Sequence, residues 1–310
     1  MKYIFLFFIS SVVFFGCSSS SHLTTYGMIG KDKSLFYYHT GTGEPVVFIH
    51  GGPGLNHSYF LPYTNRLASS YHLIYYDQKS CGQSEIPSDT NAMRLDAFVN
   101  DIETIRQKFG LKKIHLLGHS WGSMLAIKYA LKYPQNLSSL ILINPAATSS
   151  QDVREASKII NRQFDNTDQM NRTMIIESTE FKSGSPKAME KLFRLGFRQN
   201  MAQKNLADSI QLNIPEDFAK RNGALKYLFR DLADYDLYPS LKNITTPTLI
   251  IEGDQDVGLG ASEKIRTEIS MSTYKIIKDA GHFTFIEQPA AFDSIIKTFI
   301  GSLNKPVISR

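Results

Sequence analysis

The sequence predicts an α/β fold, in which a mostly parallel sheet is flanked by helices and carries an inserted helical cap. Short apolar runs alternate with amphipathic helical patterns, which is typical of strands whose two faces are both covered. Between 146 and 240 the pattern changes to helical stretches with charges of both signs and no convincing strand. A chain of 310 residues with 42% hydrophobic content is sufficient for one such core with an insertion.

The predicted core comprises residues 25–145 and 241–305, and the cap comprises residues 146–240. Its strands are recognised as apolar runs bounded by turn residues. Strands are expected directly before a glycine-rich turn at 41–43, at Val46–Ile49, at 72–77, at 113–118, at 138–144, within 246–256 and within 273–282.

Helices are predicted between these strands. From Arg94 to Phe109 apolar residues recur at helical spacing, and Gly110 suits the C-terminal cap. Further helices are expected at 124–133, 261–269 and 289–303, the last with Pro289 in its first turn. This alternation of strands and helices again indicates a parallel sheet.

The first 17 residues have the features of a signal peptide that ends in a lipobox-like sequence. The apolar stretch from Tyr3 to Phe15 is short for a bilayer span and has the length of the apolar region of a secretory signal. The small residue before Cys17 resembles a bacterial lipobox, in which the cysteine is lipidated, although Phe14 departs from the usual aliphatic residue. An uncleaved anchor and cleavage by an ordinary signal peptidase are the alternatives.

This segment predicts where the mature protein is found. Residues 18–24 are rich in serine and are expected to form a flexible tether. With lipidation at Cys17, they predict an exported lipoprotein of the bacterial cell envelope, anchored to a membrane in the periplasm or at the outer membrane.

Composition argues against several other classes of protein. The formal net charge of +5 arises from scattered Lys and Arg residues without a basic run, so nucleic acid is not an expected partner. The two cysteines form no CxxC pair and the eight histidines form no HExxH pair, so neither a metal nor another cofactor is expected. Cys81, the second of the two thiols, is interpreted as structural.

The stretch "LLGHSWGSML", residues 116–125, places Ser120 in the frame Gly118-x-Ser120-x-Gly122. Chance supplies such a frame about 0.1 times in a chain of this length, so the context decides its meaning. The frame follows a predicted strand and opens a predicted helix, which is the sharp turn at which a serine is exposed as a nucleophile. Ser120 is therefore the predicted nucleophile.

A serine hydroxyl needs a base that removes its proton, and the base needs a carboxylate that fixes its tautomer. The loop "EGDQDVG" contains Asp254 and Asp256, and the loop "DAGHFTF" after the last predicted strand contains His282. The order serine, acid, histidine predicts His282 as the base and Asp256 as the acid, with Asp254 as the alternative. His119, beside Ser120, is expected to pack or hydrogen-bond behind the turn.

A glycine pair after the strand at 46–49 supplies the remaining part of a hydrolytic site. In "HGGPG" this pair lets the backbone approach a substrate and direct an N–H group at it. The backbone N–H groups of Gly52 and Trp121 are predicted to stabilise an oxyanion. All these residues follow predicted strands at the edge where open α/β sheets place their sites.

With these motifs the chain resembles the α/β-hydrolase superfamily over almost all of 25–305. "HGGPG", "YYDQKSCGQSE" and "GHSWGSMLAIKYA" are similar to motifs of the proline iminopeptidase group, although Ser80 stands where that group usually has glycine. The resemblance implies that cap glutamates, one commonly beside a tryptophan, bind the free amino terminus of the substrate. Because the only tryptophan is Trp121, Glu177 and Glu180 are the candidate replacements, together with the acids of "RDLADYD".

The resemblance implies a serine hydrolase that forms an acyl-enzyme and releases the N-terminal residue of short peptides. An esterase or another small-molecule acyl hydrolase that uses the same residues is the alternative. A non-catalytic ligand-binding member of the fold is a third class. Haloalkane dehalogenase and epoxide hydrolase chemistry is disfavoured, because those enzymes carry aspartate at the position of Ser120.

Overall fold

The structure is a computed structural model that describes residues 24–30 and 34–304. The predicted signal segment, Cys17 and all of the tether except its last residue lie outside these ranges, so export and lipidation stay predictions. Within the described ranges, no helix combines the length and the apolar character that a membrane span requires.

The described residues form one sheet of eight strands, seven of which the sequence predicted. They are β1 (Thr25–Ile29), β2 (Leu35–Thr40), β3 (Glu44–Ile49), β4 (Tyr71–Tyr76), β5 (Ile114–His119), β6 (Leu137–Ile143), β7 (Thr248–Gly253) and β8 (Ser272–Ile277). Their order is β1-β2-β4-β3-β5-β6-β7-β8. The pairs that involve β2 are antiparallel and all others are parallel, which confirms the predicted α/β fold class.

The apolar runs became the central strands because helices cover both faces of the sheet. Every residue of β5 and of β7 is buried. The edge strand β1 was not predicted. Its sequence, "TYGMI", holds a glycine and a tyrosine, Tyr26, that is 71% exposed, so it lacks the continuous apolar character of the central strands.

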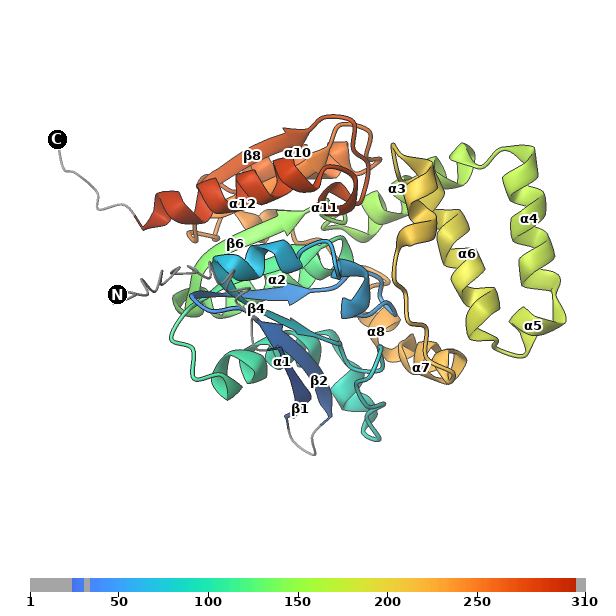
Figure 1. Cartoon of the computed structure of the whole chain (residues 1–310), viewed down its shortest axis with the longest axis horizontal. Coiled ribbons are helices and arrows are strands. Elements are labelled where there is room, and N and C mark those ends of the chain that lie inside the picture. Colours follow the sequence, from blue (N-terminus) through green and yellow to red (C-terminus); the bar gives the residue numbers. More distant parts are fainter. Residues whose placement is uncertain (1–23, 31–33, 305–310) are drawn as a thin grey trace, which may run out of the picture.

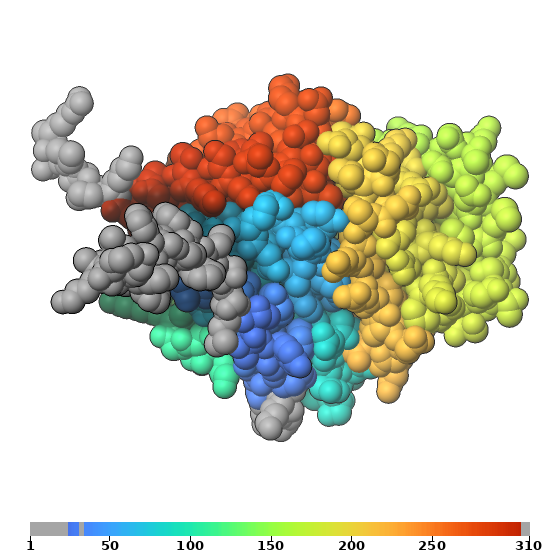
Figure 2. All heavy atoms as spheres, in the orientation of Figure 1, coloured from blue at the N-terminus to red at the C-terminus, as the bar shows by residue number. Residues whose placement is uncertain are grey.

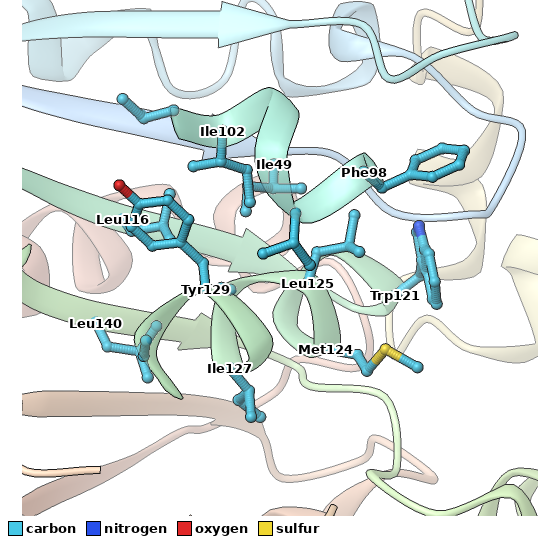
Figure 3. Packing of buried hydrophobic residues seen from close by; sticks show 14 of the residues in the cluster. Ile49, Phe98, Ile102, Leu116, Trp121, Met124, Leu125, Ile127, Tyr129 and Leu140 are labelled. Atoms are coloured by element: carbon cyan, nitrogen blue, oxygen red, sulfur yellow. The ribbon is translucent and has the colours of Figure 1, made fainter. Parts of the chain in front are cut away.

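Five helices pack against the sheet and belong to the predicted core: α1 (Leu95–Lys108), α2 (Trp121–Lys132), α10 (Leu259–Glu268), α11 (Thr284–Glu287) and α12 (Pro289–Leu303). The core also contains the short 3₁₀ helices η2 (His57–Phe60), η3 (Asn65–Ser69), η4 (Thr90–Met93) and η5 (Pro134–Asn136). Figure 3 shows side chains of α1 and α2, among them Ile102 and Leu125, packed with Leu116 of the sheet. Helix α12 contributes Phe292 and Ile296 to a second buried cluster that includes β3 and β4 residues.

The chain between β6 and β7 consists of helices, with one isolated bridge between Ser149 and Asp236 as its only extended pairing. These helices are α3 (Ser150–Gln163), α4 (Asn166–Glu177), α5 (Thr179–Lys182), α6 (Pro186–Gln199), η6 (Lys204–Ser209), α7 (Phe218–Ala224), α8 (Lys226–Asp231) and α9 (Tyr238–Leu241). Helices α3 to α6 form one end of the molecule, opposite the end of α12 (Figures 1 and 2).

Hydrogen bonds hold the cap against the loops of the core. Asn56 Nδ2 donates to the carbonyl oxygen of Leu212 at 2.7 Å, and the backbone N–H of His282 donates to the carbonyl oxygen of Asn200 at 2.6 Å. The cap therefore contacts the loops at the carboxyl edge of the sheet, where the predicted site residues lie.

Candidate active site

Ser120 occupies the turn between β5 and α2. Its φ of 54° and ψ of −123° lie in a region that residues other than glycine rarely adopt, so the backbone holds the side chain in a strained position. The flanking glycines permit this turn. A Cβ at Gly118 would collide with the carbonyl oxygen of Gly122, and a Cβ at Gly122 would collide with that of Ile49.

His282 and Asp256 form a hydrogen-bonded pair. His282 Nδ1 lies 2.7 Å from Asp256 Oδ2, which also accepts a hydrogen bond from Asn144 Nδ2 at 2.7 Å. The second oxygen, Oδ1, accepts from the backbone N–H of Gly258 at 3.0 Å. Ser120, Asp256 and His282 line one cavity, which brings together the three residues that the sequence selected.

Asp254, the alternative acid, lies outside this arrangement. Its carboxylate accepts from the backbone N–H of Ala280 at 3.4 Å and lies 3.5 Å from Lys278 Nζ. It does not line the cavity of Ser120. The geometry therefore favours Asp256 as the partner of His282.

Burial and charge set the protonation of this pair. Burial disfavours the charged imidazolium, but the adjacent Asp256 carboxylate outweighs burial and raises the pKa of His282 above 6.5. Burial alone would raise the pKa of Asp256, yet His282 and its hydrogen bonds hold that pKa below the usual range. Burial and the Asp256 charge raise the pKa of the neighbouring Glu252 well above its usual value. Asp256 is therefore the charged member of the two carboxyl groups.

Glu252, a buried neighbour at the end of β7, was not singled out from the sequence. Asn144 Nδ2 donates to both Asp256 and Glu252, at 2.7 and 3.2 Å, and Ser262 Oγ donates to the other oxygen of Glu252. The sequence did contain a signal for it: a glutamate lies within an apolar strand, shortly before an acidic residue of the following loop. A buried carboxyl group requires hydrogen-bond partners, so this pattern indicates a buried polar cluster.

Of the two predicted oxyanion donors, Gly52 shares the cavity with Ser120, and Trp121 follows Ser120 in the sequence. Gly52 lines the cavity, and its φ of 124° is a conformation that favours glycine. Trp121 is the first residue of α2, so its backbone N–H has no acceptor within the helix. The Trp121 indole is buried in the core (Figure 3), and its Nε1 donates to Gln78 Oε1 at 2.9 Å.

The cavity has a volume of about 430 Å³ and lies between the core and α3. Apolar residues form much of its lining: Pro145, Ala146, Ala147, Val153, Ala156, Ile159, Ile160, Val257 and Ala261. Its charged lining residues outside the His282 pair are Asp152, Glu155 and Lys264. Asp152 Oδ2 lies 2.8 Å from Lys264 Nζ, and this contact, together with other hydrogen bonds, lowers the pKa of Asp152.

The structure does not place Glu177 and Glu180, the predicted substrate-binding residues, at the cavity of Ser120. Both are exposed, at the end of α4 and in α5, and neither lines the cavity of Ser120. Of the acids in "RDLADYD", Asp231 is bonded to Arg94 at 2.9 Å. The cap carboxylates that line the cavity, Asp152 and Glu155, belong instead to α3, whose residues the sequence did not single out.

The departure at Ser80 and the interpretation of Cys81 both have a local explanation. Ser80 adopts a φ of 62°, the region where glycine is favoured, and its Oγ donates to the carbonyl oxygen of Arg221 at 2.9 Å. Cys81 is buried, which raises the pKa of its thiol to about 12. A neutral, buried thiol is unreactive, in agreement with a structural role.

Comparison with known proteins identifies the class. Residues 44–289 match the family model described as alpha/beta hydrolase fold, and the chain belongs to this family. Within it, the chain is similar to curated proline iminopeptidases. That of Saccharolobus solfataricus is 31% identical over 272 residues, which cover 84% of this chain and 86% of the relative, and that of Heyndrickxia coagulans is 30% identical, with 85% and 92% covered.

Solved structures share the fold. The proline iminopeptidase of Mycobacterium smegmatis aligns with a TM-score of 0.64 at 20% identity, covering 90% of this chain and 98% of the other. A thermophilic esterase from Thermogutta terrifontis aligns with a TM-score of 0.65 at 21% identity, covering 91% and 100%. The protein is thus a hydrolase by its family and its relatives.

Proposed function

We propose that the protein is a serine hydrolase of the proline iminopeptidase type, which releases the N-terminal residue of short peptides. Ser120 attacks the carbonyl carbon, while His282 accepts the hydroxyl proton and passes it to the leaving amine. Water, deprotonated by His282, then hydrolyses the acyl-enzyme. The backbone N–H groups of Gly52 and Trp121 stabilise the oxyanion in both steps.

The cavity carries this proposal, because it holds Ser120 and the His282 pair together with a carboxylate of the cap. Peptidase relatives that align over most of both chains support the same reaction class. A volume of about 430 Å³ suits a small substrate, of which the apolar lining would contact the side chain.

Asp152 is the proposed partner of the substrate's ammonium group. Its side chain is 22% exposed, whereas Glu155 is 57% exposed and pairs with Lys158 at 2.7 Å. A partly buried carboxylate binds a cation more strongly than an exposed one, since water screens it less. Lys264 forms an ion pair with this carboxylate and would compete with the ammonium group of the substrate.

That competition is the observation that favours a second candidate, an esterase. Asp152 with its charge already paired by Lys264 offers less to an ammonium group, and a neutral acyl ester needs no such partner. Esterases among the solved structures show that this fold accommodates that reaction. The two candidates share Ser120 and differ in the need for a free amine.

A substrate panel separates them. The purified protein is assayed with prolyl and alanyl anilides, the same anilides with a blocked amino group, and simple acyl esters. The aminopeptidase proposal predicts turnover of free-amine anilides and a loss of about 10-fold or more on N-blocking. Equal turnover of blocked and free substrates would support the esterase proposal and contradict the aminopeptidase proposal.

Substitution of Asp152 tests the amine site itself. Asp152→Asn is expected to raise KM for free-amine anilides about 10- to 100-fold, since a charge-assisted hydrogen bond is lost. Lys264→Gln is expected to lower that KM about two- to fivefold, because it removes an exposed competing cation. KM for acyl esters serves as the internal control and should change in neither variant.

Glu177→Gln and Glu180→Gln are matched controls for this experiment, because they remove exposed cap carboxylates that lie outside the cavity. Each should leave KM within about twofold of wild type. A larger increase of KM in either control than in Asp152→Asn would indicate that Glu177 or Glu180, and not Asp152, binds the ammonium group.

The pKa of His282 predicts the pH dependence of hydrolysis. The neutral imidazole is the active base, and the Asp256 carboxylate raises its pKa above 6.5. Activity is therefore expected to be low in acid and to rise as the pH increases through that raised pKa. The measurement is kcat/KM from about pH 5 to pH 9, and a flat profile between about pH 5 and pH 8 would contradict this role of His282.

A further inference from the structure

A chain of buried hydrogen bonds connects three loops around Ser120. The backbone N–H of Gly51 donates to Tyr59 Oη at 2.6 Å, and this hydroxyl lies 2.8 Å from His119 Nδ1. His119 Nε2 lies 2.8 Å from the carbonyl oxygen of His282. Tyr59 and His119 are each 1% exposed, so water does not compete for these bonds.

The donors and acceptors in this chain permit only one arrangement of protons. The carbonyl oxygen of His282 only accepts, so His119 Nε2 carries a proton and donates it. Burial lowers the pKa of His119 to about 3, and the neutral ring then has a free lone pair on Nδ1. The Tyr59 hydroxyl donates to Nδ1 and accepts from Gly51, so each group in the chain is satisfied.

Each end of the chain adjoins a residue of the proposed machinery. Gly51 precedes Gly52, the proposed oxyanion donor, and the other end is the backbone of His282. His119 itself directly precedes Ser120 in the sequence. We propose that Tyr59 and His119 are positioning residues, which hold the oxyanion loop and the His282 loop in register with Ser120; this inference rests on the proposed function.

The packing around Gly51 supports a rigid connection. A Cβ at Gly51 would lie 3.2 Å from Ser120 Cβ and 3.3 Å from both His119 Nδ1 and Tyr59 Oη, so these groups already surround it closely. The Tyr59 ring stacks on Phe60 with centroids 4.5 Å apart and lies edge-on to Phe283. The ring is fixed by neighbours on both sides, which leaves its hydroxyl little freedom to move.

Loss of the Tyr59 hydroxyl is therefore expected to affect the chemical step. Without it, the Gly51 N–H is buried with no acceptor, and the loop must shift to find one. A small displacement of Gly52 weakens its hydrogen bond to the oxyanion, which forms only in the transition state. Substrate binding uses other contacts, so kcat should fall and KM should not change.

The experiment compares Tyr59→Phe with Tyr75→Phe in the full chain. Tyr75 is also fully buried, and its hydroxyl bonds to Thr64 at 2.8 Å away from the cavity, so both variants remove one buried hydroxyl. Tyr59→Phe is expected to lower kcat for an activated acyl ester, and the rate of fluorophosphonate labelling of Ser120, about 10- to 100-fold. Tyr75→Phe should stay within about threefold of wild type in both assays.

His119→Leu provides the second variant if Tyr59→Phe does not fold. Leucine has neither a donor for the His282 carbonyl oxygen nor an acceptor for the Tyr59 hydroxyl, so kcat should fall as in Tyr59→Phe. In the double variant the two decreases in kcat should not add, because both substitutions break the same series of hydrogen bonds. Normal kcat in the folded single variants, or equal losses in Tyr59→Phe and Tyr75→Phe, would overturn the positioning role. A wild-type protein that neither hydrolyses esters nor reacts with the fluorophosphonate would instead contradict the proposed function.

Discussion

Ser120→Ala is expected to lower kcat/KM by about 10⁴-fold or more for every substrate that the wild-type protein hydrolyses. The proposed acyl-enzyme forms on Ser120 Oγ, and alanine removes only that atom from the strained turn. Alanine at φ 54° relieves none of the backbone strain and loses no structural hydrogen bond of Oγ, since none involves it in the described residues. The free energy of unfolding should therefore change little.

The measurement is hydrolysis of the anilide and ester panel, with thermal unfolding as the test of the fold. Ser157→Ala is the matched control, because Ser157 lines the same cavity and its hydroxyl donates to the carbonyl oxygen of Val153 within α3. It should retain activity within about twofold. A Ser120→Ala protein with more than about one tenth of wild-type activity would contradict the nucleophile assignment.

The same variant distinguishes catalysis from ligand binding alone. A fluorophosphonate probe should label the wild-type protein at Ser120 and should not label Ser120→Ala. A non-catalytic member of the fold has no need of an activated serine, so a wild-type protein that resists the probe and hydrolyses nothing would belong to that class.

Much of the core was predictable because its signals are local. Helices cover both faces of β5 and β7, so each strand is a short apolar run that stands out from its surroundings. Ser120 and Asp256 follow these two strands, and His282 follows the edge strand β8, which is only partly buried. Parallel strands bring their carboxyl ends to one edge, which places residues far apart in sequence beside one cavity.

The cap was less predictable, because the face that a helix presents depends on how it docks. Glu177 and Asp152 are both acidic residues near helix ends, and the sequence offers no distinction between them. Docking of α3 beside α10 places Asp152 next to Lys264 in the cavity, whereas α4 leaves Glu177 exposed. Tertiary packing, not local pattern, selects between these residues.

The Tyr59 connection depends on long-range geometry in the same way. Tyr59 and His119 are 60 positions apart, and their hydrogen bond requires η2 to pack against the end of β5. The sequence predicted only that His119 packs or hydrogen-bonds behind the turn, and the structure confirms this. Its two partners became evident only from the arrangement of the loops.

Asp256→Asn is expected to lower kcat by about 10³- to 10⁴-fold while the fold is retained. Asp256 receives donors on both oxygens: Gly258 N–H on Oδ1, and Asn144 Nδ2 on Oδ2 beside His282 Nδ1. An asparagine amide has one oxygen, so its NH₂ group must face a donor whichever way it turns. The correct His282 tautomer and the compensation of its developing positive charge are then lost together.

The pH profile and a matched control complete this test. Removal of the Asp256 charge takes away the interaction that raises the pKa of His282, so the residual activity should begin to rise at lower pH than in the wild type. Asp254→Asn changes the alternative acid, which is bonded only weakly to Ala280 and Lys278, and should retain activity within about threefold. A greater loss in Asp254→Asn than in Asp256→Asn would reverse the assignment. A loss in Asp256→Asn without a shift of the profile would mean that Asp256 does not set the pKa of the catalytic base.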